Sequence, residues 1–190
     1  MTKIKLGIAG THSTGKSTLI TQLGTTLTER GFRVKCVSDL ATEASNTGFP
    51  ILQNHTFEST LWIMSRGISC ELEASLQADV VLVDRPIMDA MAYLLAALNH
   101  RGCKLSPDES KYLFDLAQHH ARTYAIICKT VLDSKIPLGA GRDQDLTFRA
   151  AVDGQFQSVF SKISVSPRIV ETQSEFINFL VRDIEAALQS

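Results

Sequence analysis

The chain has 190 residues, of which 44% are hydrophobic and 21% charged, so we expect one globular domain with a substantial core. Lysine and arginine number 19 and aspartate and glutamate 20, which gives a formal net charge of -1. A general nucleic-acid binder normally carries a basic surplus, so this balance argues against that class.

A phosphate-binding signature follows the first predicted strand. The apolar run at Ile4–Ala9 predicts a strand that is buried on both faces. Directly after it, GTHSTGKSTL at Gly10–Leu19 contains the pattern G-x-x-x-x-G-K-[ST] without a departure. A helix is then predicted by the apolar stripe Leu19, Ile20, Leu23 and Leu27, which Gly31 closes.

Each residue type in this loop has a chemical reason. Glycines let successive backbone N–H groups point around a phosphate, and the helix that follows aims its positive dipole end at the same anion. Lys16 can reach the β- and γ-phosphates, and the Ser17 hydroxyl can ligate Mg²⁺. His12 occupies a variable position, so we expect it to face solvent. The predicted nucleotide-binding residues are Gly10, Ser13, Thr14, Gly15, Lys16, Ser17 and Thr18.

The second predicted strand is Val34–Val37, and Asp39 follows it closely. An aspartate at the carboxyl end of a parallel strand faces the crevice where such proteins bind ligands. There Asp39 can accept a proton from an acceptor hydroxyl or hydrogen-bond it, but a helix N-cap is an equally economical role. The next helix is predicted by the stripe Phe57, Leu61, Met64, Ile68, Leu72 and Leu76.

The third predicted strand, Val80–Val83, also ends in an acidic residue. In P-loop proteins an aspartate at the position of Asp84 holds Mg²⁺. Hydrolytic ATPases commonly place a water-activating glutamate next, but here Arg85 follows, which suits holding an acceptor near the γ-phosphate. A salt bridge at a strand end is the alternative role of Arg85. The following helix is predicted by the stripe Ile87, Met91, Leu94, Leu95 and Leu98.

The rest of the chain continues the alternation. A capping box at Ser106–Glu109 predicts a helix start, and Tyr124–Leu132 predicts a fourth strand. Residues 133–149 contain glycines and mixed charges, as a mobile lid does. Arg168–Val170 is a weaker fifth strand, and a second capping box at Thr172–Glu175 opens a final helix. Alternating strands and helices predict an α/β fold, a parallel sheet with helices on both faces, in a single domain over residues 1–190.

The stretch DRPIMDAMAY, Asp84–Tyr93, resembles the P-loop nucleoside and nucleotide kinases. It is similar to the thymidylate-kinase pattern D-R-Y-x-x-S-x-x-A-Y, except at Pro86 and Asp89, and these departures argue against thymidylate as the acceptor. The AAA-type P-loop family that includes ribosylnicotinamide-kinase domains tends to show D-R-x-x-x-D-x-x-A-Y, where Asp89 fits. The resemblance runs from Lys3 to about Glu185.

Further residues fit that AAA-type family. Its second strand ends in an acidic residue with another four positions on, as Asp39 and Glu43 do here. A glutamate-bearing helix precedes the metal strand, where Arg66–Glu71 stands. An arginine-bearing lid follows the fourth strand, where Arg142 and Arg149 stand. The resemblance implies a P-loop kinase fold with five parallel strands in the order 2-3-1-4-5.

These residues suit phosphoryl transfer, which depends on alignment and on neutralising charge. We expect a kinase of nucleotide metabolism that uses ATP and Mg²⁺ and phosphorylates a small molecule, above all a nucleoside or nucleotide. For Arg142 and Arg149 the alternative is a solvated charge on a surface loop. The predicted catalytic residues are Lys16, Asp39, Arg85 and Arg142, and the predicted metal ligands are Ser17 and Asp84.

Three other functions are alternatives to this one. A regulatory module could bind a nucleotide and turn over little. A kinase could act on a base in nucleic acid, which the near-neutral net charge disfavours. A motor-like ATPase is disfavoured by the missing glutamate after Asp84 and by the short chain. The sequence leaves open the acceptor, the choice of ATP or GTP, and whether the chain forms a homodimer.

Cysteine usage and the absence of targeting signals bear on location. The four cysteines include no C-x-x-C pair, so we expect reduced thiols with structural roles. Cys36 and Cys128 stand in apolar runs, where we expect them to fill the core. We find no targeting segment and no apolar stretch near the ~20 residues that span a bilayer. The sequence therefore predicts a cytoplasmic protein that does not bind membranes.

Overall fold

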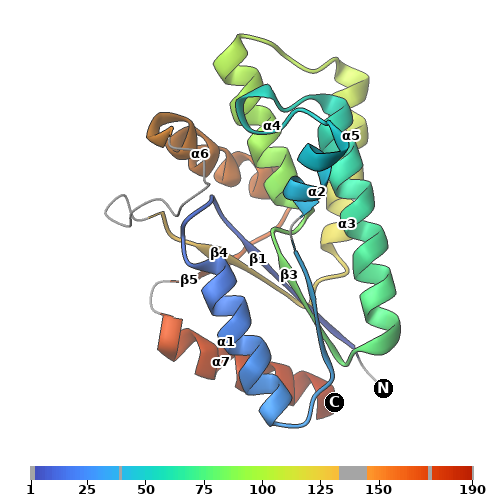
Figure 1. Ribbon diagram of the computed structural model, residues 1–190, viewed down its shortest axis with the longest axis vertical. Coiled ribbons are helices and arrows are strands. Elements are labelled where there is room, and N and C mark those ends of the chain that lie inside the picture. The colour runs from blue at the N-terminus through green and yellow to red at the C-terminus, as the bar shows by residue number, and fades with distance from the viewer. Residues whose placement is uncertain (1–2, 39, 133–144, 171–172, 190) are drawn as a thin grey trace.

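The computed structural model describes residues 3–38, 40–132, 145–170 and 173–189. Within these residues, five parallel strands form one sheet in the order β2-β3-β1-β4-β5 (Figure 1). The strands are β1 (Ile4–Ala9), β2 (Val34–Val37), β3 (Val80–Asp84), β4 (Ile126–Thr130) and β5 (Arg168–Val170). The α/β fold class and the strand order are therefore confirmed. The predicted fourth strand, 124–132, was too long by two residues at each end.

Helices cover both faces of the sheet (Figure 1). One face carries α1 (Lys16–Glu29) and α7 (Gln173–Gln189). The other face carries α2 (Leu40–Thr47), the short 3₁₀ helix η1 (Leu52–Asn54), α3 (Phe57–Gln77), α4 (Ile87–Arg101), α5 (Pro107–Ala121) and α6 (Leu146–Lys162). The capping box predicted for α5 is present, because Ser106 and Glu109 exchange hydrogen bonds with each other's backbone N–H.

The continuous apolar runs of the strands follow from this three-layer arrangement. In β3, Val80 and Leu82 pack with α1 and α7, whereas Val81 and Val83 pack with the helices of the opposite face. Because consecutive residues point to opposite faces, a strand covered on both sides needs apolar side chains at every position. The first polar residue of β3 is Asp84, at its carboxyl end.

Helix α6 was not predicted. It begins at Leu146, and Asp145 caps it by accepting a hydrogen bond from the backbone N–H of Phe148 at 2.9 Å. The predicted lid, 133–149, therefore ends inside a helix, while residues 133–144 lie outside the described part of the chain. The signal was a buried apolar stripe, Phe148, Val152, Phe156 and Val159, at helical spacing.

Two expectations about cysteine packing have opposite outcomes. Cys128 is buried in the core beneath α1 and α7, as predicted. Cys36 is exposed, contrary to prediction, because β2 lies at the edge of the sheet. All four cysteines are free thiols. In the part of the chain that the structure describes, no helix is both long and apolar enough to cross a membrane.

Candidate active site

The phosphate loop connects β1 to α1 at the carboxyl edge of the sheet. Gly10 has φ 141°, and a Cβ atom there would lie 2.2 Å from Oγ1 of Thr130, so no larger residue fits. Gly15 has φ 81° and caps α1, a helix of 14 residues whose positive dipole end faces the loop. The two glycines give the loop the tight turn that the motif requires.

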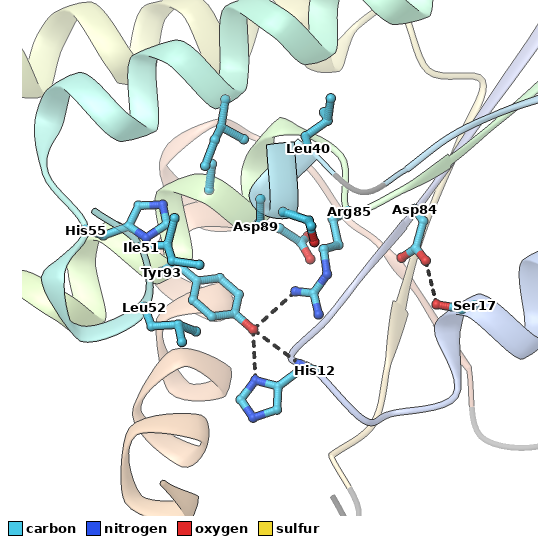
Figure 2. Close-up of a pocket in the computed structure, with 14 residues that line it drawn as sticks. His12, Ser17, Leu40, Ile51, Leu52, His55, Asp84, Arg85, Asp89 and Tyr93 are labelled. Carbon is cyan, nitrogen blue, oxygen red and sulfur yellow. Dashed lines mark hydrogen bonds between the residues drawn. The ribbon is translucent and has the colours of Figure 1, made fainter. Parts of the chain in front are cut away.

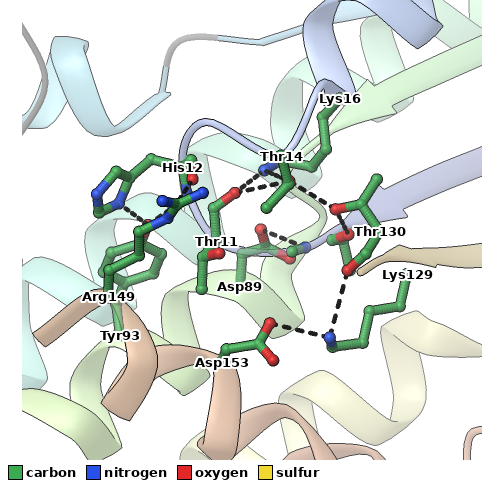
Figure 3. A network of polar contacts seen from close by, with 12 residues as sticks. Thr11, His12, Thr14, Lys16, Asp89, Tyr93, Lys129, Thr130, Arg149 and Asp153 are labelled. Atoms are coloured by element: carbon green, nitrogen blue, oxygen red, sulfur yellow. Dashed lines mark hydrogen bonds and ion pairs between the residues drawn. The ribbon is translucent and has the colours of Figure 1, made fainter. Parts of the chain in front are cut away.

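Lys16 folds back over this loop (Figure 3). Its side chain is 4% exposed, and Nζ donates to the carbonyl oxygen of Thr11 and to Oγ1 of Thr14, the latter at 3.3 Å. The hydroxyl oxygens of Thr14 and Thr130 lie 2.6 Å apart, which ties the loop to the end of β4. The ammonium group is thus held at the loop itself, close to the backbone that would surround a phosphate.

Ser17 and Asp84, the two predicted metal ligands, lie side by side. Oγ of Ser17 donates to Oδ2 of Asp84 at 2.8 Å. The other carboxylate oxygen, Oδ1, is buried and has no hydrogen-bond partner among the described residues. Mg²⁺ prefers oxygen ligands and keeps several from water or phosphate, so this hydroxyl and carboxylate fit it. No group of three or more His, Cys, Asp or Glu side chains gathers into a metal site in the described ranges.

Arg85 follows Asp84 in a left-handed backbone conformation, with φ 66°. Its Nη1 donates to the hydroxyl of Tyr93 at 3.1 Å, and the guanidinium lies 5.6 Å from the centre of that ring. Burial alone would lower the pKa of Arg85, but Tyr93 and the carboxylates of Asp89 and Asp84 outweigh it and raise the pKa. Backbone strain in a non-glycine residue is concentrated at functional sites, and here it directs a permanent positive charge into the site.

His12 is buried at 3% exposure, contrary to the prediction that it faces solvent. The Tyr93 oxygen accepts hydrogen bonds from the His12 backbone N–H at 3.2 Å and from Arg85 at 3.1 Å. Nδ1 of His12 lies 3.1 Å from the same phenol oxygen, so Tyr93 contacts both the backbone and the ring of His12. Tyr93 on α4 and Arg149 on α6 enclose this part of the loop, which is why a loop residue is buried.

Asp89 connects α4 to the phosphate loop through a hydrogen bond. The carboxylate is 2% exposed and accepts a hydrogen bond from the Gly10 backbone N–H at 3.2 Å. Burial raises the pKa of Asp89 to about 7, although the charges of Lys16 and Arg85 and the Gly10 N–H pull it down. Asp89 thus places a titratable carboxyl beneath the predicted phosphate site.

Arg149 is 1% exposed, so the alternative that it is a solvated charge on a surface loop is wrong. Its Nε donates to the carbonyl oxygen of His12 at 3.1 Å, and its Nη2 donates to that of Ser13 at 2.9 Å (Figure 3). The side chain reaches the loop from α6, on the side of Tyr93. Arg149 therefore positions the loop backbone.

A cavity of about 190 Å³ opens beside these groups (Figure 2). Ser17, Asp84 and Arg85 lie toward one end, and His55 with Ile51 and Leu52 lies toward the other. The remaining lining residues are His12, Leu40, Ala41, Thr42, Ile63, Asp89, Ala90 and Tyr93. The structure thus brings the predicted metal ligands and Arg85 together around one largely apolar cavity.

Other predicted positions have mixed outcomes. Asp39 and Arg142 lie outside the described residues. Glu43, on α2, accepts a hydrogen bond from Nε of Arg66 at 3.0 Å, so these two residues join α2 to α3. Three residues at the site were given no role from the sequence: Tyr93, Thr130 and His55. Tyr93 belongs to the kinase-like pattern and could have been found, but no sequence signal marks the other two.

Solved structures share this architecture. A thymidylate kinase from Candida albicans has a TM-score of 0.65 at 17% identity, covering 97% of this chain and 92% of that one. NadR in complex with NAD and AMP-PNP has a TM-score of 0.64 at 12% identity. The match covers 99% of this chain and 50% of the NadR chain, so this chain spans about half the length of NadR. A deoxyadenosine kinase from M. mycoides has a TM-score of 0.63 at 11% identity, covering 96% and 100%. These likenesses show the fold.

The parallel sheet, its strand order and the glycine loop ahead of α1 define a P-loop NTPase fold of the kinase type. The sequence also matches the AAA domain family over residues 5–175. The chain belongs to this family, which confirms the AAA-type resemblance. No curated protein matches the chain at a significant level.

Proposed function

We propose that this protein is a kinase that transfers the γ-phosphoryl group of ATP, with Mg²⁺, to a nucleoside or nucleotide. The observation that carries the proposal is the cavity of about 190 Å³ next to Ser17, Asp84 and Arg85. A hydrolase needs only water beside the γ-phosphate, whereas a phosphotransferase also needs a place for its acceptor. The apolar lining of this cavity suits an organic molecule.

The ligands bound to two structural neighbours support this class of acceptor. NadR has been solved in complex with NR, and the deoxyadenosine kinase with its products dcmp and dcdp. Those ligands belong to those proteins, which are 12% and 11% identical to this chain. Together with the cavity they favour an acceptor of nucleoside size.

On the donor side, the loop N–H groups and Lys16 would hold the phosphates of ATP, and Ser17 with Asp84 would hold Mg²⁺. When bound, Mg²⁺ supplies positive charge that neutralises the transferring phosphoryl group. To bind a phosphate, the Lys16 ammonium would exchange its bonds to Thr11 and Thr14 for bonds to phosphate oxygens. The N-terminus of α1 adds a fixed positive potential at the same place.

On the acceptor side, Arg85 would hold the acceptor or the moving phosphoryl group. Its guanidinium stays charged at any physiological pH and is oriented by Tyr93, so little reorganisation is needed at the moment of transfer. No glutamate stands beside Asp84 to activate water. Asp39 as the group that receives the acceptor proton, and Arg142 on a closing lid, remain predictions from the resemblance.

The test is a transfer screen with labelled ATP against nucleosides, nucleotides, ribosylnicotinamide and an oligonucleotide, run again with labelled GTP. We expect one acceptor to be phosphorylated in a Mg²⁺-dependent reaction that the Lys16→Ala variant does not catalyse. Saturable nucleotide binding with no phosphorylated acceptor would instead favour a regulatory module. Label transferred only to an oligonucleotide would favour a kinase whose acceptor is a base in nucleic acid. The proposal includes a cytoplasmic location, with which the free thiols are compatible.

A further inference from the structure

His55 is a buried polar side chain at the apolar end of the cavity. It is 3% exposed and lines the cavity together with Ile51 and Leu52 (Figure 2). Neither Nδ1 nor Nε2 has a hydrogen-bond partner among the residues that the structure describes. Buried polar atoms are nearly always satisfied, so two unsatisfied ring nitrogens facing a cavity point to a ligand.

The position of His55 is fixed by its backbone. Arg101 of α4 donates from Nη1 to the carbonyl oxygen of Gln53 and from Nη2 to that of His55. Leu52, three residues earlier, begins η1 in a strained left-handed conformation with φ 57° and also lines the cavity. The ring is also 6.1 Å from that of Tyr93, centre to centre. The imidazole is therefore held at the wall of the cavity, with both of its nitrogens buried and unpaired among the described residues.

The imidazole is uncharged at neutral pH. Burial, and then the charge of Arg101, lower the pKa of His55 to about 4. A neutral imidazole presents one N–H donor and one lone-pair acceptor. Because it brings no positive charge, it cannot compensate a buried carboxylate or phosphate, and its best partner is an uncharged polar group.

The positions of Arg85 and His55 place this partner at the far end of the acceptor. Both groups lie near Tyr93: the Arg85 guanidinium is 5.6 Å from the centre of the Tyr93 ring, and the His55 ring is 6.1 Å from it. They lie on opposite sides of Tyr93 in Figure 2. A molecule whose hydroxyl or phosphate lies near Arg85 would therefore extend its opposite end toward His55, between Leu52 and Tyr93.

We propose that His55 determines acceptor specificity by hydrogen-bonding an uncharged donor-and-acceptor edge, such as an amide or an aminated ring edge, on a flat heterocycle. The inference rests on the proposed function, because it assumes that the cavity is the acceptor site. It excludes acceptors whose distal end is a carboxylate or a second phosphate. Enzyme sites built to hydrogen-bond a group reject analogues that lack it far more strongly than apolar pockets reject a missing methylene.

The test compares acceptor pairs that differ only at the ring edge: adenosine with purine riboside, cytidine with its 4-deamino analogue, and ribosylnicotinamide with pyridine riboside. Affinity is measured by calorimetry, so the result does not depend on phosphate transfer, and kcat/KM is measured for any pair that reacts. The variants are His55→Phe, which keeps the ring shape, and His55→Gln, which keeps one donor and one acceptor. His119→Phe is the matched control, because His119 is exposed on α5 and does not line the cavity.

We expect wild type and His119→Phe to bind the intact member of one pair at least about tenfold more tightly than its edge-deleted partner. His55→Phe should bind the two alike, and His55→Gln should recover part of the difference. If His55→Phe lost affinity for both members of a pair to the same extent, the inference would be overturned, since His55 would then only shape the cavity. The inference would also be overturned if the wild type bound both members of every pair equally tightly, or if an acceptor with an acidic distal end bound most tightly. If discrimination is found but no acceptor is phosphorylated, the proposed kinase activity fails while the role of His55 stands.

Discussion

Nη2 of Arg149 donates to the carbonyl oxygen of Ser13 at 2.9 Å, although 136 positions separate the two residues in the sequence. Ser13 has a left-handed φ of 56° within the phosphate loop. Nε of the same guanidinium holds the carbonyl of His12. Helix α6 thus stabilises a strained loop by binding two successive carbonyl groups from the side of α4.

Arg149→Ala should loosen this loop. Two carbonyl groups lose a charged donor in a buried place, so we expect the free energy of unfolding to fall by about 2–3 kcal/mol. Affinity for an ATP analogue should fall about tenfold, which is ~1.4 kcal/mol. Urea unfolding and calorimetry measure the two effects. Arg182→Ala, at an exposed position on α7, is the control and should change stability by no more than about 0.5 kcal/mol.

A second buried charge cluster lies away from the cavity, around Glu71 of α3. Its carboxylate is fully buried and receives hydrogen bonds from Nζ of Lys5 at 2.8 Å, from Nε2 of His120 at 2.7 Å and from the hydroxyl of Tyr124 at 2.5 Å. Burial alone would raise the pKa of Glu71, but these three partners outweigh it, and the pKa lies below its ordinary value of 4.5.

Acidification should therefore destabilise the protein through Glu71. The pKa in the folded state is lower than in the unfolded state, so the carboxylate contributes stability above its ordinary value of 4.5 and loses it as the pH falls through the folded pKa. Glu71→Gln should cost about 3–5 kcal/mol at pH 7, because Lys5 is left buried without its counter-charge. In urea unfolding, the stability of Glu71→Gln should fall less steeply than that of the wild type as the pH falls below 4.5. A variant with the wild-type pH profile would show that Glu71 does not govern acid stability.

The sequence predicted what local patterns determine. An apolar run predicted β1, and the phosphate-binding motif predicted the glycine loop after it. A second apolar run predicted β3, which placed Asp84 and Arg85 at the end of that strand. It could not predict the burial of His12, which depends on Tyr93 and Arg149 from distant helices. Nor could it predict His55, because the carbonyl bonds that fix it come from Arg101, 46 positions away.

Lys16→Ala should abolish phosphate transfer while the protein stays folded. The ammonium donates hydrogen bonds to Thr11 and Thr14, both in the phosphate loop, so we expect its loss to change the free energy of unfolding by less than about 1 kcal/mol. Transfer should fall by a factor of about 10³ or more, since the charge serves the phosphates. Lys35→Ala, on the exposed side of β2, is the control. Near-normal turnover of Lys16→Ala would refute the phosphate-loop assignment.

Asp84→Asn should weaken nucleotide binding with Mg²⁺ much more than binding without it. The lost charge faces the proposed ion beside Ser17, and a neutral amide is a poorer ligand for Mg²⁺. Asp79→Asn is the matched control, because Asp79 stands just before β3, at the opposite end of the strand, and pairs there with Arg33 at 2.6 Å. The measurement is the affinity for an ATP analogue with Mg²⁺ and with EDTA. Equal weakening under both conditions would assign Asp84 a structural role.

Arg85 separates a kinase from a regulatory module. If it holds the acceptor or the charge that develops during transfer, Arg85→Ala should leave nucleotide affinity almost unchanged and lower the rate of transfer by about 10³–10⁵. Arg85→Lys should recover only part of the rate, because an ammonium lacks the planar fork. Both variants keep a non-glycine residue at φ 66°, so the backbone strain is the same and the comparison isolates the side chain.

The measurements for Arg85 are nucleotide affinity and single-turnover transfer on the wild type and the two variants. Loss of the guanidinium also removes the hydrogen bond of 3.1 Å to Tyr93, so thermal unfolding must show that both variants are folded at the assay temperature. A regulatory module predicts a different pattern, in which no acceptor-dependent turnover exists and Arg85→Ala alters only stability. Transfer at the wild-type rate by Arg85→Ala would mean that the arginine only braces Tyr93 and His12, and the acceptor side of the proposed site would have to be assigned anew.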